Sequence, residues 1–308
     1  MENKGSLSHS RSENNGSGNC NGVQSLKRRK IIEQKKVTDQ LIEVACAQKD
    51  HLSPFPSLRH YNRGGLSLYL QSGRGNKLSC SVKKYIQNLL KINMEGPYGS
   101  QWPTEEKVKH REMVSTQARY IFVHEASHAN ANGKPSKSDA EKTSTTLNKK
   151  DPMVAFVHFR FIIEEMIPVL YVYELQIEPR FQGRGLGTFL MELIELIACK
   201  NCMGAVVFTV QKANFKALNF YRNRLRYTIS SISPSRANSL MAIDASYEIL
   251  CKAFNEEAKA VLEQNVPLPF VDKRLCSGIS LISSVIEVPN PNHPLHSNGY
   301  WIICEPMN

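Results

Sequence analysis

The segment PRFQGRGLGTFLM, residues 179–191, decides the fold of this chain. Gly183, Gly185 and Gly187 stand between VLYVYELQIE, which is typical of a β-strand, and an apolar run with a helical period. Glycines let backbone N–H groups approach an anion closely, and a helix begins with unpaired N–H groups at its positive end. The loop alone fits two interpretations equally, a pyrophosphate site or a tight turn without a ligand.

Two familiar phosphate-binding motifs do not fit this loop. A dinucleotide fingerprint needs a wider glycine spacing and an acidic residue about 20 positions further on. A P-loop needs Gly-Lys-Ser/Thr, and no lysine follows Gly187. The loop instead adds the charge of Arg184 and the hydroxyl of Thr188 to its glycines. The phosphate interpretation that remains is a strand-loop-helix pyrophosphate site of another class.

The elements around the loop predict a mixed α/β domain. We expect a helix after the loop that buries Leu186, Phe189, Leu190, Leu193, Ile194 and Ile197. The chain order strand, glycine loop, helix, strand implies a parallel crossover. Residues 50–115 look mixed and mostly helical. Strands are expected at residues 118–125, 153–165, 169–178, 204–211, 226–230 and 246–253, with a hairpin between the second and third of them and a helix over 214–225.

Composition restricts the class of protein. The chain has 308 residues and a formal net charge of +11, with a pI of about 9.2, which favours a polyanionic ligand or neighbour. Its eight cysteines are widely spaced, and its first residues lack the apolar segment of a secretory signal. No apolar run reaches the roughly 18 residues of a membrane span. We expect a soluble intracellular protein with no membrane contact.

Composition also divides the chain. Residues 1–25 are rich in Ser, Asn and Gly and are expected to be disordered, and the polar segment at about 126–151 is expected to be a surface insertion. Residues 253–308 form an extension to which we assign no chemistry. The cluster Lys27-Arg28-Arg29-Lys30 starts a predicted helix and fits a solvated helix face, a nuclear import signal or an RNA contact.

Several motifs in order resemble one family. The QxxGxG loop, the preceding YVYELQI and the later NFKALNFYR resemble the GNAT family of acetyl-coenzyme A-dependent N-acetyltransferases. VAFVHFRF, SSISPS, SYEIL and the GPYGSQW stretch at residues 96–102 are similar to its NatD type, the N-alpha-acetyltransferases of histone amino termini that begin Ser-Gly-Arg-Gly. The resemblance implies a GNAT domain over residues 26–252, with a mixed central sheet, flanking helices and a splayed strand at the acetyl-coenzyme A site.

The resemblance also implies where acetyl-coenzyme A binds. The loop is expected to hold the pyrophosphate, the preceding strand the pantetheine arm, and the start of the next helix a further cofactor contact. The implied cofactor-binding residues are Leu175, Gln176, Ile177, Gln182, Gly183, Arg184, Gly185, Leu186, Gly187, Thr188 and Asn214.

An α-amine must lose its proton before it attacks a thioester, so a general base is needed. Glu174 is the predicted base, because it stands mid-strand shortly before the loop and because the resemblance implies this role for the matching glutamate. Strict alternation would place Tyr173 and Glu174 on opposite faces of the sheet, so both can serve one site only if the strand bulges or splays. The family implies such a splay. The freed N–H groups of Leu175 to Ile177 are then expected to polarise the acetyl carbonyl. A role for Tyr221 as general acid is left open.

The acceptor site is predicted from the same resemblance. No Lys or Arg lies between Arg160 and Arg180, whereas Glu164, Glu165, Glu174 and Glu178 do, so a locally acidic site for a substrate arginine is expected. Ile162 stands where the family has a second acidic residue, which predicts looser selectivity. The implied substrate-binding residues are Tyr98, Trp102, Ile162, Glu164, Tyr171, Tyr173, Thr209 and Tyr247, and for Trp102 core packing is an equal interpretation.

Further expectations concern metals and partners. Cys199-x-x-Cys202 has no second metal-binding pair nearby, so we interpret it as packing and expect no metal. The predicted partners are histone amino-terminal peptides and, through the basic helix, a ribosome or nucleosome. The chain is expected to be a monomer in the nucleus and cytoplasm.

Overall fold

The computed structural model describes residues 20–126, 151–237 and 245–264. All of these belong to one compact unit, Met1–Val266, and the second unit, Pro267–Asn308, lies outside the described residues. The predicted insertion at about 126–151 and most of the predicted extension at 253–308 therefore also fall outside them. The first helix begins at Cys20, before the boundary near residue 26 that composition suggests.

An eight-stranded mixed sheet forms the centre of the fold, with the strand order β1-β2-β3-β4-β5-β6-β8-β7. Neighbouring strands are antiparallel, except that β5 and β6 are parallel and are joined through the helix that follows the glycine loop. This confirms the predicted fold class and the crossover. The strands are β1 (His60–Arg63), β2 (Leu66–Arg74), β3 (Arg119–Glu125), β4 (Met153–Glu164), β5 (Ile167–Ile177), β6 (Ala205–Gln211), β7 (Thr228–Ile229) and β8 (Tyr247–Ala253).

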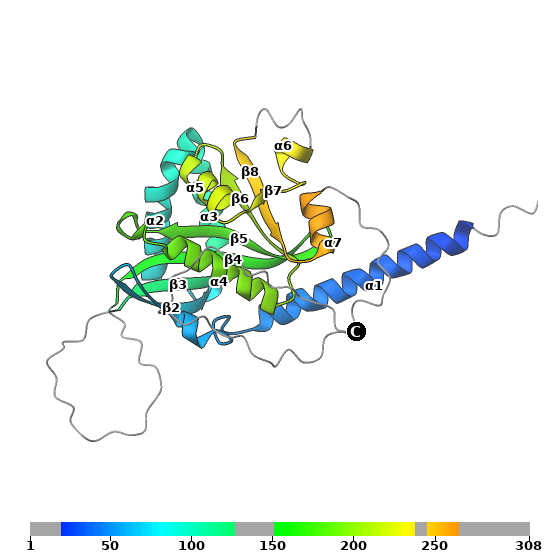
Figure 1. Cartoon of the computed structure of the whole chain (residues 1–308), viewed down its shortest axis with the longest axis horizontal. Helices are drawn as coiled ribbons and strands as arrows, with labels where there is room; N and C mark the ends of the chain where they lie inside the picture. Colours follow the sequence, from blue (N-terminus) through cyan, green and yellow to red (C-terminus); the bar gives the residue numbers. More distant parts are fainter. Residues whose placement is uncertain (1–19, 127–150, 238–244, 265–308) are drawn as a thin grey trace, which may run out of the picture. The chain divides into compact units, whose positions relative to one another are not determined.

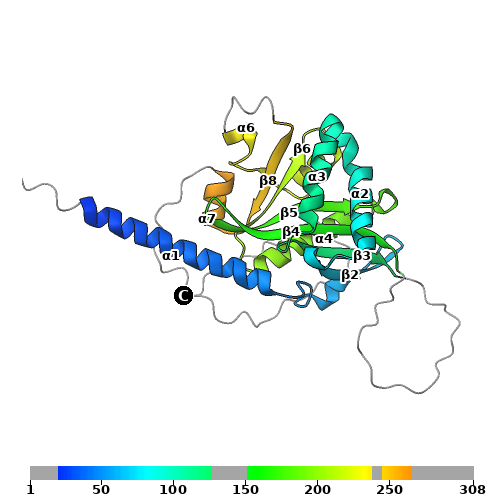
Figure 2. The ribbon, with the colours of Figure 1, turned by 180° about the vertical axis from the view of Figure 1, so that it is seen from behind.

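Helices cover both faces of the sheet, and Figures 1 and 2 show them from opposite sides. The main helices are α1 (Cys20–Ala47), α2 (Cys80–Tyr98), α3 (Trp102–Met113) and α4 (Leu186–Lys200). α1 and α4 lie against one face, and α2 and α3 lie against the other. Shorter helical segments are α5 (Phe215–Asn219), a π-helical turn at Phe220–Arg224, α6 (Pro234–Ala237), α7 (Glu256–Ala258) and a π-helical turn at Lys259–Glu263.

Two apolar cores explain this layering. The core between the sheet and α1/α4 contains the residues that the helical period of α4 predicts to point inward, with Phe189 only partly buried. The second core lies between the sheet and α2/α3, where Ile86, Leu89 and Leu90 of α2 pack on Tyr120 and Phe156. Since both faces are covered, the central strands β4 and β5 are buried in mid-sheet and can position side chains rigidly.

Residues 50–115 are mixed and mostly helical, as predicted, because α2 and α3 lie there. The same region also contains the strands β1 and β2, which the sequence prediction did not place. They form a hairpin whose turn is Gly64-Gly65, with φ values of +60° and +73° that suit glycine. Alternation along β2 buries Leu66, Leu68 and Leu70. The run is short, and its pairing partner β3 lies about fifty positions further along the chain, so a local pattern does not distinguish it from a helix.

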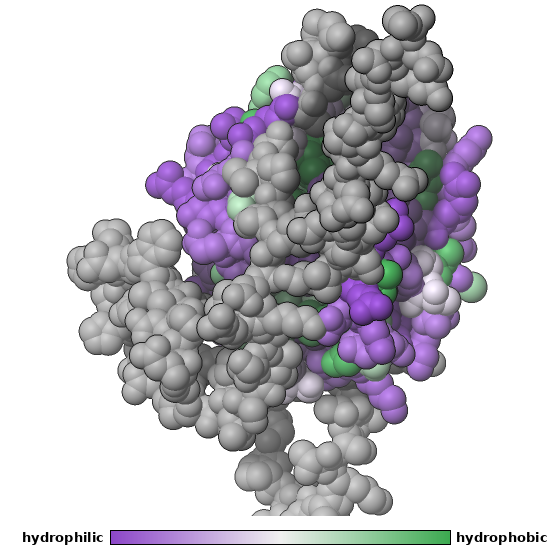
Figure 3. Space-filling model, turned by 90° about the vertical axis from the view of Figure 1, so that its right-hand side faces the viewer, coloured by the Kyte–Doolittle hydropathy of each residue, from purple (hydrophilic) through white to green (hydrophobic). Residues whose placement is uncertain are grey.

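The helix α1 is only partly packed. Leu41, Ile42 and Ala45 contact the core, whereas other apolar residues of its predicted stripe, Ile31, Ile32, Val37 and Val44, are exposed. The described residues on the side of the molecule shown in Figure 3 are mostly hydrophilic, with hydrophobic residues in small separate areas. Within the described part of the chain, no helix meets the length and hydropathy needed to cross a membrane.

Candidate active site

A bulge in β5 creates the site. Residues Leu175 and Glu174 pair with Val157 and His158 of β4, but the next pair is Phe159 with Val172, so Tyr173 is an extra residue. The bulge places Glu174 opposite His158 on the α2/α3 face, and the Tyr173 ring stacks on His158 on that same face, 4.9 Å between centroids. The predicted irregularity of the strand is therefore confirmed.

The strands β5 and β6 separate where the bulge lies. Their parallel pairing runs from Val169 with Ala205 to Val172 with Phe208 and then stops. Because the Glu178 N–H donates to Val154 of β4 (3.0 Å), alternation turns the N–H groups of Leu175 and Ile177 toward the gap. This is the predicted splay, and it leaves backbone donors facing an opening in the sheet.

A cavity of about 710 Å³ occupies this gap. Its walls come from α2, α3, the bulged part of β5, the glycine loop, β6 and the helical segment after β6. Of the predicted site residues it is lined by Tyr98, Tyr173, Glu174, Leu175, Gln176, Ile177, Gln182, Gly183, Gly185, Gly187, Thr188, Thr209 and Asn214. The structure therefore brings both ends of the predicted site into one cavity.

The glycine loop has the geometry of an anion cradle. Gly183 and Gly185 have φ values of +74° and +84°, and α4 begins directly after Gly185. The loop is braced by Tyr61 of β1, whose hydroxyl donates to the Arg184 carbonyl (2.6 Å). The Thr188 hydroxyl oxygen is buried beside the cavity and has no hydrogen-bond partner in the described structure. An orphaned hydroxyl at a helix start fits a bound phosphate oxygen.

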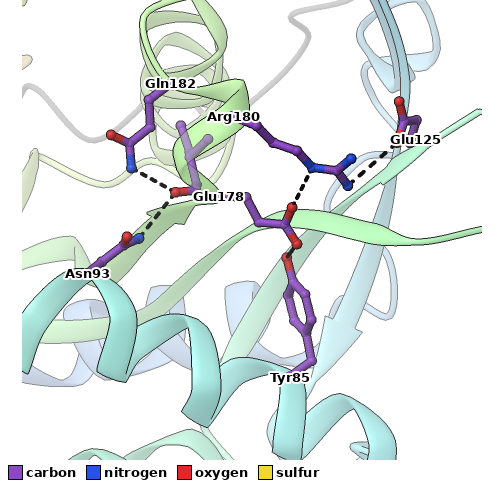
Figure 4. Close-up of polar contacts among 7 residues, drawn as sticks. Tyr85, Asn93, Glu125, Glu178, Arg180 and Gln182 are labelled. Atoms are coloured by element: carbon purple, nitrogen blue, oxygen red, sulfur yellow. Dashed lines mark hydrogen bonds and ion pairs between the residues drawn. The ribbon is translucent and has the colours of Figure 1, made fainter.

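Side chains from α2 and from the glycine loop converge on the end of β5, as Figure 4 shows. Asn93 and Gln182 both donate to the Ile177 carbonyl, at 3.1 Å and 2.9 Å. Asn93 also donates to Gln176 (2.9 Å). Asn214 caps α5 by accepting from the Ala217 N–H (3.2 Å) and lines the cavity as predicted.

Glu174 is buried and held by two donors. Lys109 of α3 forms an ion pair with its Oε1, and Gln176 donates to its Oε2 (2.8 Å). The Lys109 ammonium also lies 5.4 Å from the centre of the Tyr98 ring. Burial disfavours the charged form of Lys109, but attraction to Glu174 and Tyr98 outweighs it and raises the pKa of Lys109. The predicted base is thus one half of a buried ion pair.

The acceptor side of the cavity is aromatic. The Tyr171 hydroxyl and the Thr209 hydroxyl lie 2.6 Å apart, and the Tyr171 and Tyr173 rings are 5.2 Å apart. Arg160 of β4 lies over the Tyr173 ring at 4.2 Å and donates to the Glu112 carbonyl of α3 (2.8 Å). Burial raises the pKa of the Glu112 carboxyl, against the attraction of Lys109.

Seven predicted site residues do not line the cavity. Trp102 is 4% exposed and belongs to the α2/α3 core, so the packing interpretation holds for its side chain. Leu186 is likewise a core residue, at 1% exposure. Arg184 contributes its carbonyl to the Tyr61 contact. The remaining four are half-buried on β4, β5 and β8 outside the cavity walls: Ile162, Glu164, Tyr171 and Tyr247.

The prediction of a locally acidic site needs correction. Lys109 and Arg160 enter the site from α3 and from the other side of the bulge, so positive charge accompanies Glu174. Glu178 points elsewhere: Tyr85 donates to it (3.1 Å), and it pairs with Arg180 (2.9 Å), as Figure 4 shows. Counting charges between Arg160 and Arg180 failed because α3, distant in the chain, supplies Lys109, and because Arg160, at the edge of that stretch, lies over Tyr173.

Tyr221 lines the cavity, and its ring centre lies 4.4 Å from that of Phe208. Burial raises the pKa of its hydroxyl, and the charge of Glu174 raises it further, so it stays protonated and has a proton to donate. Asn93, Lys109 and Tyr61 are the polar site residues that the sequence interpretation missed. They lie on helices and a strand whose local pattern carries no cofactor signal.

The cysteine pair does not pack as predicted. Cys199 and Cys202, at the end of α4, are both exposed. In the residues that the structure describes, no group of three or more His, Cys, Asp or Glu side chains is placed to hold a metal ion.

Comparison with known proteins gives a match to one family model, over less than half of the chain. Residues 93–225 match the model of the acetyltransferase (GNAT) family. Solved structures with a similar fold include an acetyltransferase from Listeria monocytogenes (10% identity, 63% of this chain, 99% of that chain, TM-score 0.39). Others are a PaiA N-acetyltransferase from Thermoplasma acidophilum in complex with coenzyme A (14%, 61%, 100%, 0.38) and Arabidopsis thaliana Naa50 with a bisubstrate analogue (14%, 60%, 99%, 0.35).

Proposed function

Residues 93–225 match the model of the acetyltransferase (GNAT) family, and we propose that the chain is a member that transfers acetyl from acetyl-coenzyme A to the free N-terminal α-amine of proteins. The proposed substrates are histone tails that begin Ser-Gly-Arg-Gly. The observation that supports this best is one cavity in which a buried carboxylate, Glu174, faces a strand gap that ends at a glycine-loop anion cradle.

The residues of the cradle fit the cofactor. Gly183, Gly185 and the start of α4 offer backbone N–H groups to a pyrophosphate, and the unpartnered Thr188 hydroxyl offers one more donor. The N–H groups of Leu175 and Ile177 face the gap and can hydrogen-bond an extended amide arm or a carbonyl oxygen. When bound, acetyl-coenzyme A supplies an acetyl group activated as a thioester.

The acceptor amine attacks as a neutral group, and this chain's role is to remove and store its proton. As the new C–N bond forms and the C–S bond breaks, the proton on nitrogen passes to the Glu174 carboxylate, directly or through one water. Tyr221 is protonated and lines the same cavity, so it can donate to the departing sulfur. Among the residues that the structure describes, no cysteine lines the cavity, which favours direct transfer over an acyl-enzyme.

The histone preference is supported by the acceptor side. Burial raises the pKa of Tyr171 to about 12 despite its bond to Thr209, and the charges of Glu164, Tyr173 and Tyr247 act on the same hydroxyl. Glu164 is half-buried on β4 outside the cavity walls, and we propose that a substrate arginine that follows the amine extends from the cavity to pair with it. Ile162 on the same face offers no second carboxylate, so discrimination for arginine at that position should be modest.

The test is acetylation of a Ser-Gly-Arg-Gly peptide by the wild type and by Glu174→Gln. We expect the variant to lose at least about 100-fold in kcat at neutral pH, as for removal of a general base. Glu95→Gln, an exposed position on α2, is the matched control and should keep the wild-type rate. Equal rates for wild type and Glu174→Gln would remove Glu174 as the base.

The same peptide with a blocked α-amine and a free lysine side chain tests the acceptor class. A GNAT enzyme for lysine side chains or small amines is the second candidate, and it would acetylate blocked peptides as well as free ones. The third candidate is a non-catalytic protein that binds RNA or the ribosome through its basic helix. It predicts no acetyl-coenzyme A binding in calorimetry.

The proposal includes partners and location. Arg28, Arg29, Lys35 and Lys36 are exposed on α1, which suits contact with a nucleosome or ribosome. We place the protein in the nucleus and cytoplasm as a monomer. Analytical ultracentrifugation and fractionation of cells test these points.

A further inference from the structure

The proposed reaction uses Glu174 as its base and gives no role to Lys109, the ion-pair partner of Glu174. The Lys109 ammonium contacts the Glu174 carboxylate, the group that is to receive the amine's proton, and the Lys109 side chain is only 12% exposed. A lysine that merely filled space would not line the cavity beside Tyr173 and Leu175. Its charge therefore acts on whatever amine enters this site.

An acceptor amine bound in the site places a second titratable group beside Glu174. The amine and the Glu174 carboxylate then share one proton between them, and they titrate as a pair. The reactive state is the one in which the amine is neutral and the carboxylate is ionised, ready to take the proton that bond formation releases. Glu174 alone would work against that state, because a carboxylate beside an ammonium favours the ammonium.

Lys109 reverses this bias. A fixed positive charge beside the pair favours loss of the shared proton, whether the proton sits on the amine or on the carboxyl group. Two features keep that charge in place: the ion pair itself and the Tyr98 ring 5.4 Å below the ammonium. Burial lowers the pKa of Lys109, but Glu174 raises it more, so Lys109 stays charged when an acceptor ammonium enters the site.

Other charged and titratable groups face this pair from each element packed against it. Among these groups, the protonated tyrosine hydroxyls and the neutral His158 imidazole carry no charge at neutral pH. Arg160 does not contact Glu174 in this arrangement, because it lies over Tyr173 and donates to the Glu112 carbonyl. Lys109 is thus the cation in direct contact with Glu174. The groups are Tyr98 (α2), Glu112 (α3), Tyr120 (β3), His158 and Arg160 (β4) and Tyr221 (after α5).

We propose that Lys109 is a positioning residue for acetyl transfer: it orients Glu174 and drives the shared proton off the pair formed by Glu174 and the acceptor amine. This rests on the proposed function. It explains why an otherwise costly buried lysine stands next to the base.

The experiment measures the single-turnover rate of acetyl transfer against pH, with peptide and acetyl-coenzyme A saturating. In Lys109→Met the acid limb should move up by about one pH unit, so the rate at pH 7 falls about tenfold and recovers at higher pH. KM for the peptide should stay equal or fall, because the ammonium then pairs with Glu174 unopposed. Lys109→Arg keeps the charge and should keep the wild-type limb.

Two controls separate this role from a loss of fold. Lys107→Met removes an exposed lysine from the same helix and should leave the profile unchanged. Lys109→Gln retains a donor for Glu174 without the charge, and serves if the Met variant does not fold. A peptide whose α-amine is made less basic by fluorination of its first residue should restore most of the lost rate in either neutral variant.

The outcomes are distinct. If the acid limbs of Lys109→Gln or Lys109→Met coincide with that of the wild type, the inference is wrong. Higher activity of either variant at pH 7 would also overturn it, because Lys109 would then be a competitor for the acceptor's place on Glu174. Absence of α-amine acetylation by the wild type itself contradicts the proposed function instead, and the same profile can then be measured with a lysine acceptor.

Discussion

The two ends of the cavity are built in different ways. At the cofactor end, Gln182 to Thr188 form a continuous stretch whose glycine conformations and helix start create the anion cradle. At the acceptor end, Lys109, Arg160 and Tyr173 come from a helix and two strands. The first end is local in sequence and the second is assembled by packing. A local motif can be recognised by spacing, whereas an assembled site depends on what each helix brings across the sheet.

This difference has a consequence for charge. The cofactor end is organised by backbone groups, which carry dipoles but no net charge. At the acceptor end, side chains of opposite sign are placed in contact, and Glu174 and Lys109 neutralise one another until a substrate amine enters. Changes at the first end should therefore alter cofactor affinity, and changes at the second should alter the acceptor's KM or the pH profile.

Gly185→Ala should have the largest effect at the cofactor end. The residue needs φ of +84°, and an added Cβ would lie 2.9 Å from the Tyr61 hydroxyl that braces the loop. We expect about a 30-fold or greater loss of acetyl-coenzyme A affinity in calorimetry, and a stability loss of about 1 kcal/mol or more in thermal unfolding. Gly65→Ala is the matched control, since its φ is +73° with open space around it. Equal affinity losses in both variants would contradict the cradle.

Thr188→Val should separate binding from stability. The hydroxyl is buried without a partner, so its removal should leave stability unchanged or raise it by about 1 kcal/mol. If the hydroxyl donates to a phosphate, affinity for acetyl-coenzyme A falls about tenfold in the same variant. Unaltered affinity, measured by calorimetry, would show that Thr188 takes no part in the cradle.

Arg160→Met should have the smallest effect and act at the other end. It removes the cation over the Tyr173 ring, an interaction of about 1 kcal/mol, so KM for the peptide should rise about fivefold. Affinity for acetyl-coenzyme A should stay at the wild-type value. Arg111→Met, which removes an exposed arginine of α3, is the control. A change in cofactor affinity instead of KM would erase the distinction between the two ends.

Much of the cofactor end could be read from the sequence because it depends on short-range rules. Glycine spacing, the strand before it and the helix after it are all set within about thirty residues, and the structure confirms this order. The bulge was expected only through the family resemblance, since Tyr173 and Glu174 have no local signal for it. β1 and β2 were missed because strand pairing is non-local, and with them the contact from Tyr61 to the loop.

The sequence by itself determined the mixed sheet, its parallel crossover and the glycine loop between strand and helix, because these follow from periodicity and from the conformations that glycine permits. The anion site and the role of Glu174 were implied by the family resemblance. Only the tertiary structure decided which residues form the acceptor end and which charges they bring to it. It turned Trp102 into the core and Glu178 toward Arg180, and it brought Lys109 to Glu174. The physical reason is that a side chain's electrostatic neighbours are fixed by which helix packs on which face, and helix packing depends on contacts between residues far apart in the chain.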